Sequence, residues 1–207
     1  DLKRAHAIIE ARLSTAETLA TLAGLLGATY PTEALDLAWR QILYSSSPNR
    51  LGMAATHRTY VNALASYREA AELIDQVIRK ASAYIAREAD TIAAAPLDTR
   101  NVQAVVVTNP SAWTRTDVCT VTVFPEATQA LGIIDDTGTP VPVFPEAVRR
   151  TTPSLRGSTA AEAISSYETR RLTFVAQNVP PLGYRTYYLV PREGFPKPVT
   201  SDDAQIE

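Results

Sequence analysis

Residues 39–70 read WRQILYSSSPNRLGMAATHRTYVNALASYREA, and this stretch decides the fold of the first half of the chain. Apolar residues recur every three or four positions on both sides of its centre, whereas positions 45–55 contain three serines, Pro48, Asn49 and Gly52. Helical spacing that is broken by turn-forming residues predicts two helices joined by a polar loop. The residues expected on the inner face of the helix before the loop are Leu35, Trp39, Ile42 and Leu43.

Capping signals mark the ends of the predicted helices. Thr32 is the expected N-cap of the helix before the loop, and Thr56 is the expected N-cap of the long helix after it. Gly27 stands where a glycine would end an earlier helix. The inner positions expected for that earlier helix are Ala5, Ile8, Ile9, Leu13, Ala16, Ala20, Ala23 and Leu26. The inner positions expected for the long helix are Tyr60, Leu64, Tyr67, Ala71, Ile74, Ile78, Ala81, Ile85 and Ile92. These stripes predict a three-helix bundle over residues 1–95.

Beyond Pro96 the hydrophobic period falls to two, and Val, Thr, Tyr and Pro dominate. The strands expected from this alternation lie at 105–108, 117–124, 167–179 and 184–190, with a hairpin at 131–143 that turns at 136–139. Short strands separated by turn signals predict a small antiparallel β-sandwich-like domain over 96–207. A mobile surface loop is expected at 146–166, and an extended tail at the C-terminal end. The predicted fold class is therefore α+β, with the three-helix bundle first.

Composition excludes several kinds of protein. The 207 residues carry a formal net charge of −2 and their basic residues are scattered, which argues against binding to nucleic acid or to an anionic membrane. No apolar run approaches the ~20 residues that a membrane-spanning helix needs. The single cysteine, Cys119, excludes an internal disulfide and is interpreted as a small core residue. Without a signal peptide before the first helix, a cytoplasmic protein is expected, and the missing initiator methionine indicates a part of a longer chain.

Two strings in the second half are distinctive. The first reads VTNPSAWTRTD at 107–117, and the second reads FVAQNVPPLGYR at 174–185. Together with the helical strings LDLAWR at 35–40 and YVNAL at 60–64, they resemble the central helical domain and the following β-domain of family 38 glycoside hydrolases, the zinc-dependent retaining α-mannosidases. The resemblance covers nearly the whole chain and is carried mainly by the two β strings.

The resemblance implies a non-catalytic middle fragment of such an enzyme. In that family a preceding α/β domain carries the nucleophilic Asp and most zinc ligands, and one further ligand comes from a His-Asp pair after the second helix of the bundle. Aligned without gaps from Trp39 to Tyr60, this pair falls on Pro48 and Asn49. Proline cannot bind a metal, and an asparagine carbonyl is a poor zinc ligand. The chain alone is therefore expected to have no catalytic residue, no metal site and no cofactor, whereas its parent would hydrolyse terminal α-linked mannose with zinc.

The same resemblance implies partners. The chain would lack the catalytic domain and a large C-terminal β-domain of its own polypeptide, which would leave apolar surfaces that favour self-association into a homo-oligomer. The places expected for these surfaces are Leu51 and Met53 in the loop at 45–55, and the tail after Pro196. The alternative is a stand-alone scaffold or carbohydrate-binding module without hydrolase activity.

Polar side chains in the helical half allow a functional and a structural interpretation. His57 is either a displaced zinc ligand or an exposed residue at the start of a helix. His6 has no His or Cys four residues later, so a metal site on that helix is not supported. Ser45, Ser46 and Ser47 lack the glycines of a nucleophile elbow and are interpreted as a polar loop.

The same choice arises for acids and aromatic residues of the second half. A retaining glycosidase needs two carboxyls ~5 Å apart across the bond that it cleaves. The adjacent pairs Asp135-Asp136 and Asp202-Asp203 are therefore interpreted as turn and solvation residues. The aromatic residues that form either a sugar-stacking platform or core and cross-strand pairs are Trp113, Tyr184, Tyr187 and Tyr188.

Overall fold

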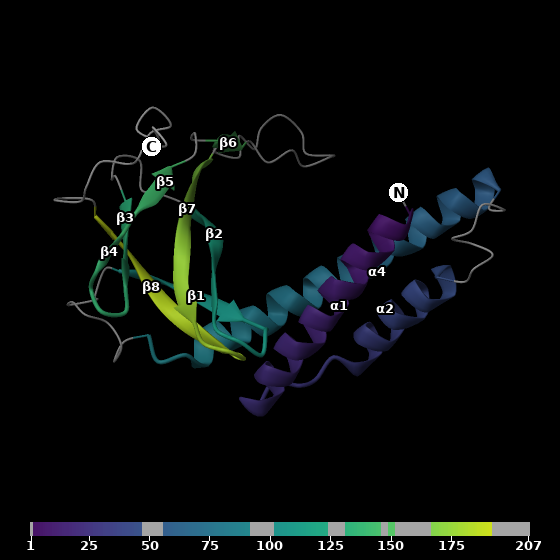
Figure 1. Cartoon of the computed structure of the whole chain (residues 1–207), viewed down its shortest axis with the longest axis horizontal. Coiled ribbons are helices and arrows are strands. Elements are labelled where there is room, and N and C mark those ends of the chain that lie inside the picture. Colours follow the sequence, from purple (N-terminus) through teal and green to yellow (C-terminus); the bar gives the residue numbers. More distant parts are fainter. Residues whose placement is uncertain are drawn as a thin grey trace, which may run out of the picture. The chain divides into compact units, whose positions relative to one another are not determined.

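The computed structural model describes residues 2–46, 56–91, 102–123, 131–145, 149–151 and 167–191. The chain separates into two compact units, Asp1–Ala89 and Asp90–Glu207, called here the helical unit and the β unit. Their helices and strands are labelled in Figure 1. The predicted α+β class, a helical bundle with a small β-domain, is confirmed. Among the described residues, no helix is both long and apolar enough to cross a membrane.

The helical unit consists, in its described part, of α1 (Leu2–Leu25), α2 (Thr32–Ser45) and α4 (His57–Glu88). Both α1 and α2 pack along α4, and their inner faces share one apolar core. The most completely buried members of this core are Leu13, Ala16, Ala38, Ile42, Ala63, Ala70 and Ile74. Alanines at several of these positions let the helix axes approach closely, as in other helical bundles.

Two of the three predicted caps are confirmed. The Gly27 N–H donates to the Gly24 carbonyl at 3.0 Å and the Ala28 N–H donates to Ala23 at 2.9 Å, which is a Schellman motif. Gly27 has a φ of +105°, which side chains rarely tolerate. Thr56 caps α4 by accepting a hydrogen bond from the Thr59 N–H at 3.3 Å. The prediction for Thr32 is wrong by one residue, because Pro31 is the N-cap and its side chain has no acceptor.

Among the described positions expected on the inner stripes, three are exposed instead, and Ile92 lies outside the described residues. Leu43 is 61% exposed, Ile8 50% and Leu26 48%. Successive residues of a helix lie about 100° apart. Ile8 therefore points away from the core that its neighbour Ile9 faces, and Leu43 points away from the core that Ile42 faces. Leu26 lies past the last residue of α1, where the helical period no longer applies.

The β unit contains two antiparallel sheets. One has the strand order β1 (Gln103–Asn109), β8 (Gly183–Pro191), β3 (Leu131–Asp135) and β4 (Pro140–Val141). The other has the order β2 (Arg115–Val123), β7 (Tyr167–Val179) and β5 (Val143–Pro145), with β6 (Arg149–Thr151) also paired to β7. Both sheets contribute to one core, in which Phe174 lies 5.0 Å from Tyr187 between ring centroids. The two sheets therefore pack face to face.

The predicted alternation and hairpin are confirmed, and one expectation needs correction. Along β2, Cys119, Val121 and Val123 are more buried than the threonines between them. The turn at 136–139 joins β3 to β4 through a hydrogen bond from the Asp135 N–H to the Thr139 carbonyl at 3.0 Å. The segment 146–166 was expected to be loop throughout, but Arg149–Thr151 pairs with β7. The rest of that segment, the tail after Pro196 and the loop with Leu51 and Met53 lie outside the described residues.

Candidate functional site

The two distinctive strings meet at one end of the β unit, where β7 contains a bulge. The pairing of β2 with β7 shifts between Arg115 and Asp117, so that Gln177 and Asn178 together oppose one residue of β2. Asn178 adopts a φ of +52°, in the left-handed region that Asn tolerates better than most residues. A bulge leaves backbone groups without their partners in the neighbouring strand.

Side chains take the place of those backbone partners. The Gln177 N–H donates to the Tyr187 hydroxyl at 3.1 Å, and the Gln177 carbonyl accepts from Arg185 Nη1 at 2.8 Å. The Asn178 N–H donates to Thr116 Oγ1 at 3.0 Å. These hydrogen bonds stabilise the bulge, because they pair backbone groups that have no partner in β2.

Asn109 joins the same corner from β1. Its side chain is 2% exposed, and its Nδ2 donates to the carbonyls of Trp113 at 2.8 Å, Val179 at 3.1 Å and Pro180 at 3.1 Å. Its Oδ1 accepts from the Ser111 N–H at 3.0 Å. One buried amide therefore holds the 110–114 loop against the end of β7. We call Asn109, Thr116, Arg185 and Tyr187 the corner cluster.

Arg185 also connects the corner cluster to the β3–β4 hairpin. Its Nη2 donates to Asp135 Oδ2 at 3.1 Å and to Asp136 Oδ1 at 2.7 Å. Burial raises the pKa of Asp135, but hydrogen bonds from Thr137 and Thr139 and the Arg185 charge outweigh burial, so the pKa is lowered overall. Both carboxylates thus serve as anchors for an arginine, in agreement with a turn role.

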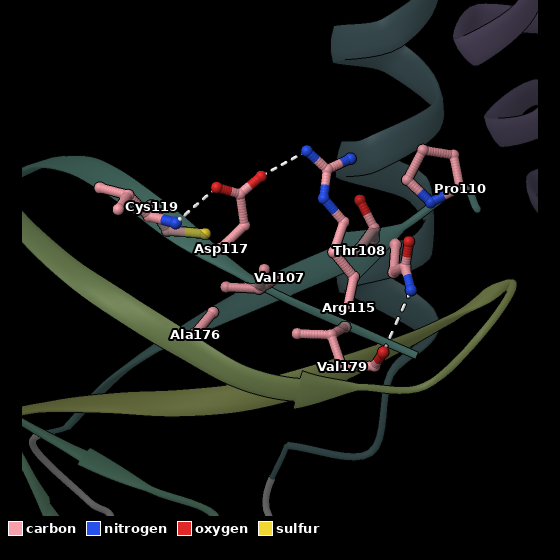
Figure 2. A pocket seen from close by; sticks show the side chains of 10 residues that line it. Val107, Thr108, Pro110, Arg115, Asp117, Cys119, Ala176 and Val179 are labelled. Atoms are coloured by element: carbon pink, nitrogen blue, oxygen red, sulfur yellow. Dashed lines mark hydrogen bonds and ion pairs between the residues drawn. The ribbon is translucent and has the colours of Figure 1, made fainter. Parts of the chain in front are cut away.

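Beside the corner cluster lies a hollow of about 150 Å³ between the edge strands β1 and β2 (Figure 2). Apolar lining comes from Val107, Pro110, Val118, Ala176 and Val179. The polar and titratable lining residues are Thr108, Asn109, Arg115, Asp117 and Cys119.

The charged groups of the hollow are paired with each other. Figure 2 shows Arg115 reaching to the Asp117 carboxylate, whose Oδ1 also accepts from the Val118 N–H at 2.8 Å. The hydrogen bond from Val118 and the Arg115 charge lower the pKa of Asp117. Burial, together with the nearby Asp117 charge, raises the pKa of Cys119, which keeps it a neutral thiol rather than a nucleophilic thiolate.

A second hollow, of about 320 Å³, lies within the helical unit. Its lining is mostly small: Ala20, Ala23, Gly27, Ala28, Thr29, Pro31, Val77, Lys80, Ala81 and Tyr84. The Tyr84 hydroxyl donates to the Leu26 carbonyl at 3.4 Å. Among the described residues of this lining, Lys80 is charged and none is an aspartate or a glutamate.

The histidines and serines that the sequence singled out are placed as follows. His57 is exposed at the first position of α4. His6 lies on α1 with Nδ1 3.4 Å from the Tyr67 hydroxyl and Nε2 3.7 Å from Glu10. The assignment of Ser45 to the polar loop is wrong, because Ser45 is the last residue of α2 and is fully buried. Ser46 bonds to the Leu43 carbonyl at 2.8 Å, and Ser47 lies outside the described residues. Within the described residues, no group of three or more His, Cys, Asp or Glu side chains could hold a metal ion.

Two further hypotheses concern the predicted zinc-ligand position and the aromatic platform, and the described residues test only the second. Pro48, Asn49, Asp202 and Asp203 lie outside the described residues. The four-residue platform is wrong, because Tyr187 is 1% and Tyr188 2% exposed. Tyr187 belongs to the corner cluster, and the Tyr188 hydroxyl donates to the Thr91 carbonyl at 2.9 Å. Trp113 and Tyr184 remain at the surface, 68% and 40% exposed.

Sequence reasoning did not foresee the corner cluster, although the signal was present. Asn109, Thr116 and Arg185 all stand in the two strings that carried the resemblance. Polar residues at fixed places in otherwise apolar strands are a sign of side chains that bond to backbone. The two strings therefore contain the residues whose hydrogen bonds join the ends of the two sheets.

Comparison with solved structures agrees with the fold. The chain is similar to an α-mannosidase from Enterococcus faecalis V583, with a TM-score of 0.76 and 19% identity, over 97% of this chain and 24% of that one. It is also similar to a protein of glycosyl hydrolase family 38 from Enterococcus faecalis, with a TM-score of 0.75 and 18% identity, over 97% of this chain and 25% of that one. No protein-family model matches the sequence, and no curated protein does. The chain spans about a quarter of the length of these two structures, and its fold is that of the corresponding part of a family 38 glycosyl hydrolase.

Proposed function

We propose that this chain is a non-catalytic part of an α-mannosidase-like glycoside hydrolase. The observation that carries the proposal is the likeness in fold over 97% of the chain to a solved α-mannosidase of which it spans 24%. In the parent protein, residues outside this chain would supply the carboxylates and the zinc of a retaining hydrolase that removes terminal α-linked mannose. The parent would work in the cytoplasm.

Several described aspartates are paired with arginines, which supports a structural rather than a catalytic role for them. Asp135 and Asp136 hold Arg185, Asp117 holds Arg115, and Asp75 holds Arg12. A glycosidase acid–base pair needs one carboxyl with a raised pKa beside one that stays ionised. Among the described aspartates, Asp117 and Asp135 have shifted pKa values, and both pKa values are lowered, which suits structural ion pairs.

Exposed apolar residues on α2 support the proposal that other domains of the same polypeptide pack against this chain. Leu37, Leu43 and Tyr44 of α2 are 47%, 61% and 63% exposed. Apolar surface of this kind marks places where another domain or a second copy of the chain packs. The proposed partners are a catalytic domain and a larger β-domain, and self-association through these surfaces is expected when they are missing.

Activity of the purified 207-residue chain tests this proposal. With p-nitrophenyl α-mannoside and added zinc, the chain is expected to release no more nitrophenol than a heat-denatured sample. A longer polypeptide that includes the residues encoded upstream is expected to show turnover that a chelator abolishes. Turnover by the 207-residue chain itself would refute the non-catalytic assignment. An inactive longer polypeptide would refute the assignment of its parent as a hydrolase.

A scaffold or carbohydrate-binding module is the second candidate. The observation that favours it is the indole of Trp113, which is 68% exposed on a loop that Asn109 holds in place. Exposed, rigidly held aromatic rings suit stacking against ligands at little cost in conformational entropy. Retention of the chain on an insoluble polysaccharide, lost in Trp113→Ala, would favour this candidate over a purely supporting unit.

A further inference from the structure

The hollow between β1 and β2 has walls that do not need to rearrange for binding. Asn109 holds its loop side through four hydrogen bonds, and the bulge beside it is closed by Thr116, Arg185 and Tyr187. A preformed pocket avoids the cost of ordering loops when a ligand binds. Its volume of about 150 Å³ lies below the ~300–1,000 Å³ of pockets for drug-sized molecules. The hollow therefore suits one small ring or one small group.

Hydrogen-bonding capacity remains free at its rim. A guanidinium has several N–H donors, and Arg115, 52% exposed, uses one of them on Asp117. Asp117 accepts from Arg115 and Val118 and keeps further lone pairs. The hydroxyl of Thr108, which lines the same hollow, makes no hydrogen bond within the described part of the chain. Donors and acceptors thus stand together above an apolar floor.

Charge and strand geometry narrow the kind of ligand. Arg115 and Asp117 neutralise each other, so neither a free anion nor a free cation gains an unpaired partner here. An added peptide strand is also disfavoured, because the bulge between β2 and β7 lies at this end and bulges twist an edge away from pairing. What remains is a neutral molecule with both hydroxyl groups and an apolar face.

We propose that this hollow binds one neutral hydroxylated ring, the chemistry of a single sugar residue. The apolar face of the ring would lie on Val107 and Val179, and its hydroxyls would bond to Arg115, Asp117 and Thr108. This proposal rests on the hollow alone and does not depend on the relation to a hydrolase.

Chemical shifts of the isotope-labelled 207-residue chain test the proposal. Titration with D-glucose and with D-mannose is expected to move the backbone amides of 107–109 and 115–119 in a saturable way. Cyclohexanol has the ring without most hydroxyls, and sodium acetate has the charge without the ring. Both are expected to move these amides less than at least one hexose does at equal concentration.

A matched pair of variants locates the binding. Thr108→Val removes the free hydroxyl at constant shape and is expected to weaken hexose binding about 2- to 10-fold, the range for one neutral hydrogen bond. Thr120→Val is the control, because Thr120 pairs with Thr173 at 3.0 Å and does not line the hollow. Its affinity is expected to equal that of the unaltered chain.

Three results would overturn the proposal. The first is that neither hexose moves the amides of 107–109 and 115–119. The second is that cyclohexanol or acetate saturates the same amides at lower concentration. The third is that Thr108→Val binds as the unaltered chain does.

Discussion

In the helical unit the core is apolar and the polar contacts between helices keep some access to solvent, whereas in the β unit polar side chains are buried at the corner. Trp39 Nε1 donates to Glu17 at 2.7 Å and Gln41 to Glu69 at 3.0 Å, both with at least partial access to solvent. Asn109, by contrast, is 2% exposed and joins residues 70 and 71 positions apart. Surface polar pairs stabilise little, but a buried polar group that loses its partners costs several times more.

This difference explains why the two distinctive sequence strings lie in the β unit rather than in the helical unit. A helical core tolerates many apolar residues of similar volume, so its sequence carries periodicity and few fixed letters. A corner that must satisfy named backbone groups accepts few substitutes for Asn109 or Arg185. The strings that point to a fold can therefore be structural, and their presence says nothing by itself about catalysis.

Replacing Asn109 by Asp is expected to have the largest effect on the β unit. A carboxylate would face three carbonyl oxygens without an N–H to donate, which is expected to lower the free energy of unfolding by about 3 kcal/mol or more. Hydrogen exchange of amides in β1 and β8 would measure this loss, and amides of α4 are expected to keep their protection. Asn62→Asp on the exposed side of α4 is the matched control, expected to change stability by less than about 0.5 kcal/mol. Equal loss of protection in both units would contradict the separate stabilisation of the two.

Ile74→Ala probes the apolar side of the comparison. Ile74 is 0% exposed, so its truncation is expected to cost about 2–5 kcal/mol through lost burial and a new cavity. Ile78 is only partly buried, and Ile78→Ala is expected to cost less. Ile8→Ala, at a position 50% exposed, is the control. Urea unfolding monitored through α-helical circular dichroism would measure all three. A core that is packed differently would reverse the order of Ile74 and Ile78.

Asp135→Asn should produce a loss that depends on pH. The pKa of Asp135 is lowered from 3.8 in the folded chain, so the folded state binds its proton less readily than the unfolded state. Its stabilising contribution is therefore present above about pH 4 and is lost as the pH falls through the lowered pKa. The variant is expected to lose about 2 kcal/mol at pH 6, because hydrogen bonds to charged groups are the stronger ones. Unfolding at pH 6 and at pH 3 would measure the difference, which should shrink at pH 3. A loss that is equal at both values would show that the carboxylate charge is not involved.

Two backbone positions give the smallest effects, with opposite signs. Gly27→Ala is expected to lower stability by about 1 kcal/mol, because a φ of +105° disfavours a side chain and a Cβ would lie 3.3 Å from the Tyr84 hydroxyl. Leu182, at a φ of +48°, occupies a left-handed conformation without the usual glycine. Leu182→Gly is expected to raise stability by about 0.5 kcal/mol, since relief of that strain is partly offset by chain entropy. Melting temperatures of the two variants would check both signs. Destabilisation by Leu182→Gly would mean that the half-exposed leucine packs against something that compensates its backbone.

Periodicity was sufficient to predict the helices, the hairpin and the strands because each buries one face. It failed at Leu26, which lies past the end of α1, and at Leu43, which follows the buried Ile42 and points about 100° away from it. The corner cluster could not be predicted, because its bonds join residues that are distant in sequence and pair side chains with backbone. The hollow was not predicted either, because its lining combines residues on both sides of the β1–β2 connection with Ala176 and Val179 of β7.

The distance in sequence between Asn109 and its partners has a consequence for the time course of synthesis. The helical unit is complete by Ala89, so it can fold while later residues are still being added. Asn109 must wait for Val179, Pro180 and the Tyr187 that supports the bulge, a delay of roughly 4–16 s at about 5–20 residues per second. During that interval β1 and β2 have emerged without β7 and β8, and their apolar faces are open to chaperones or to neighbouring chains. The β unit, rather than the helical unit, is thus the part of the nascent chain expected to depend on protection during translation.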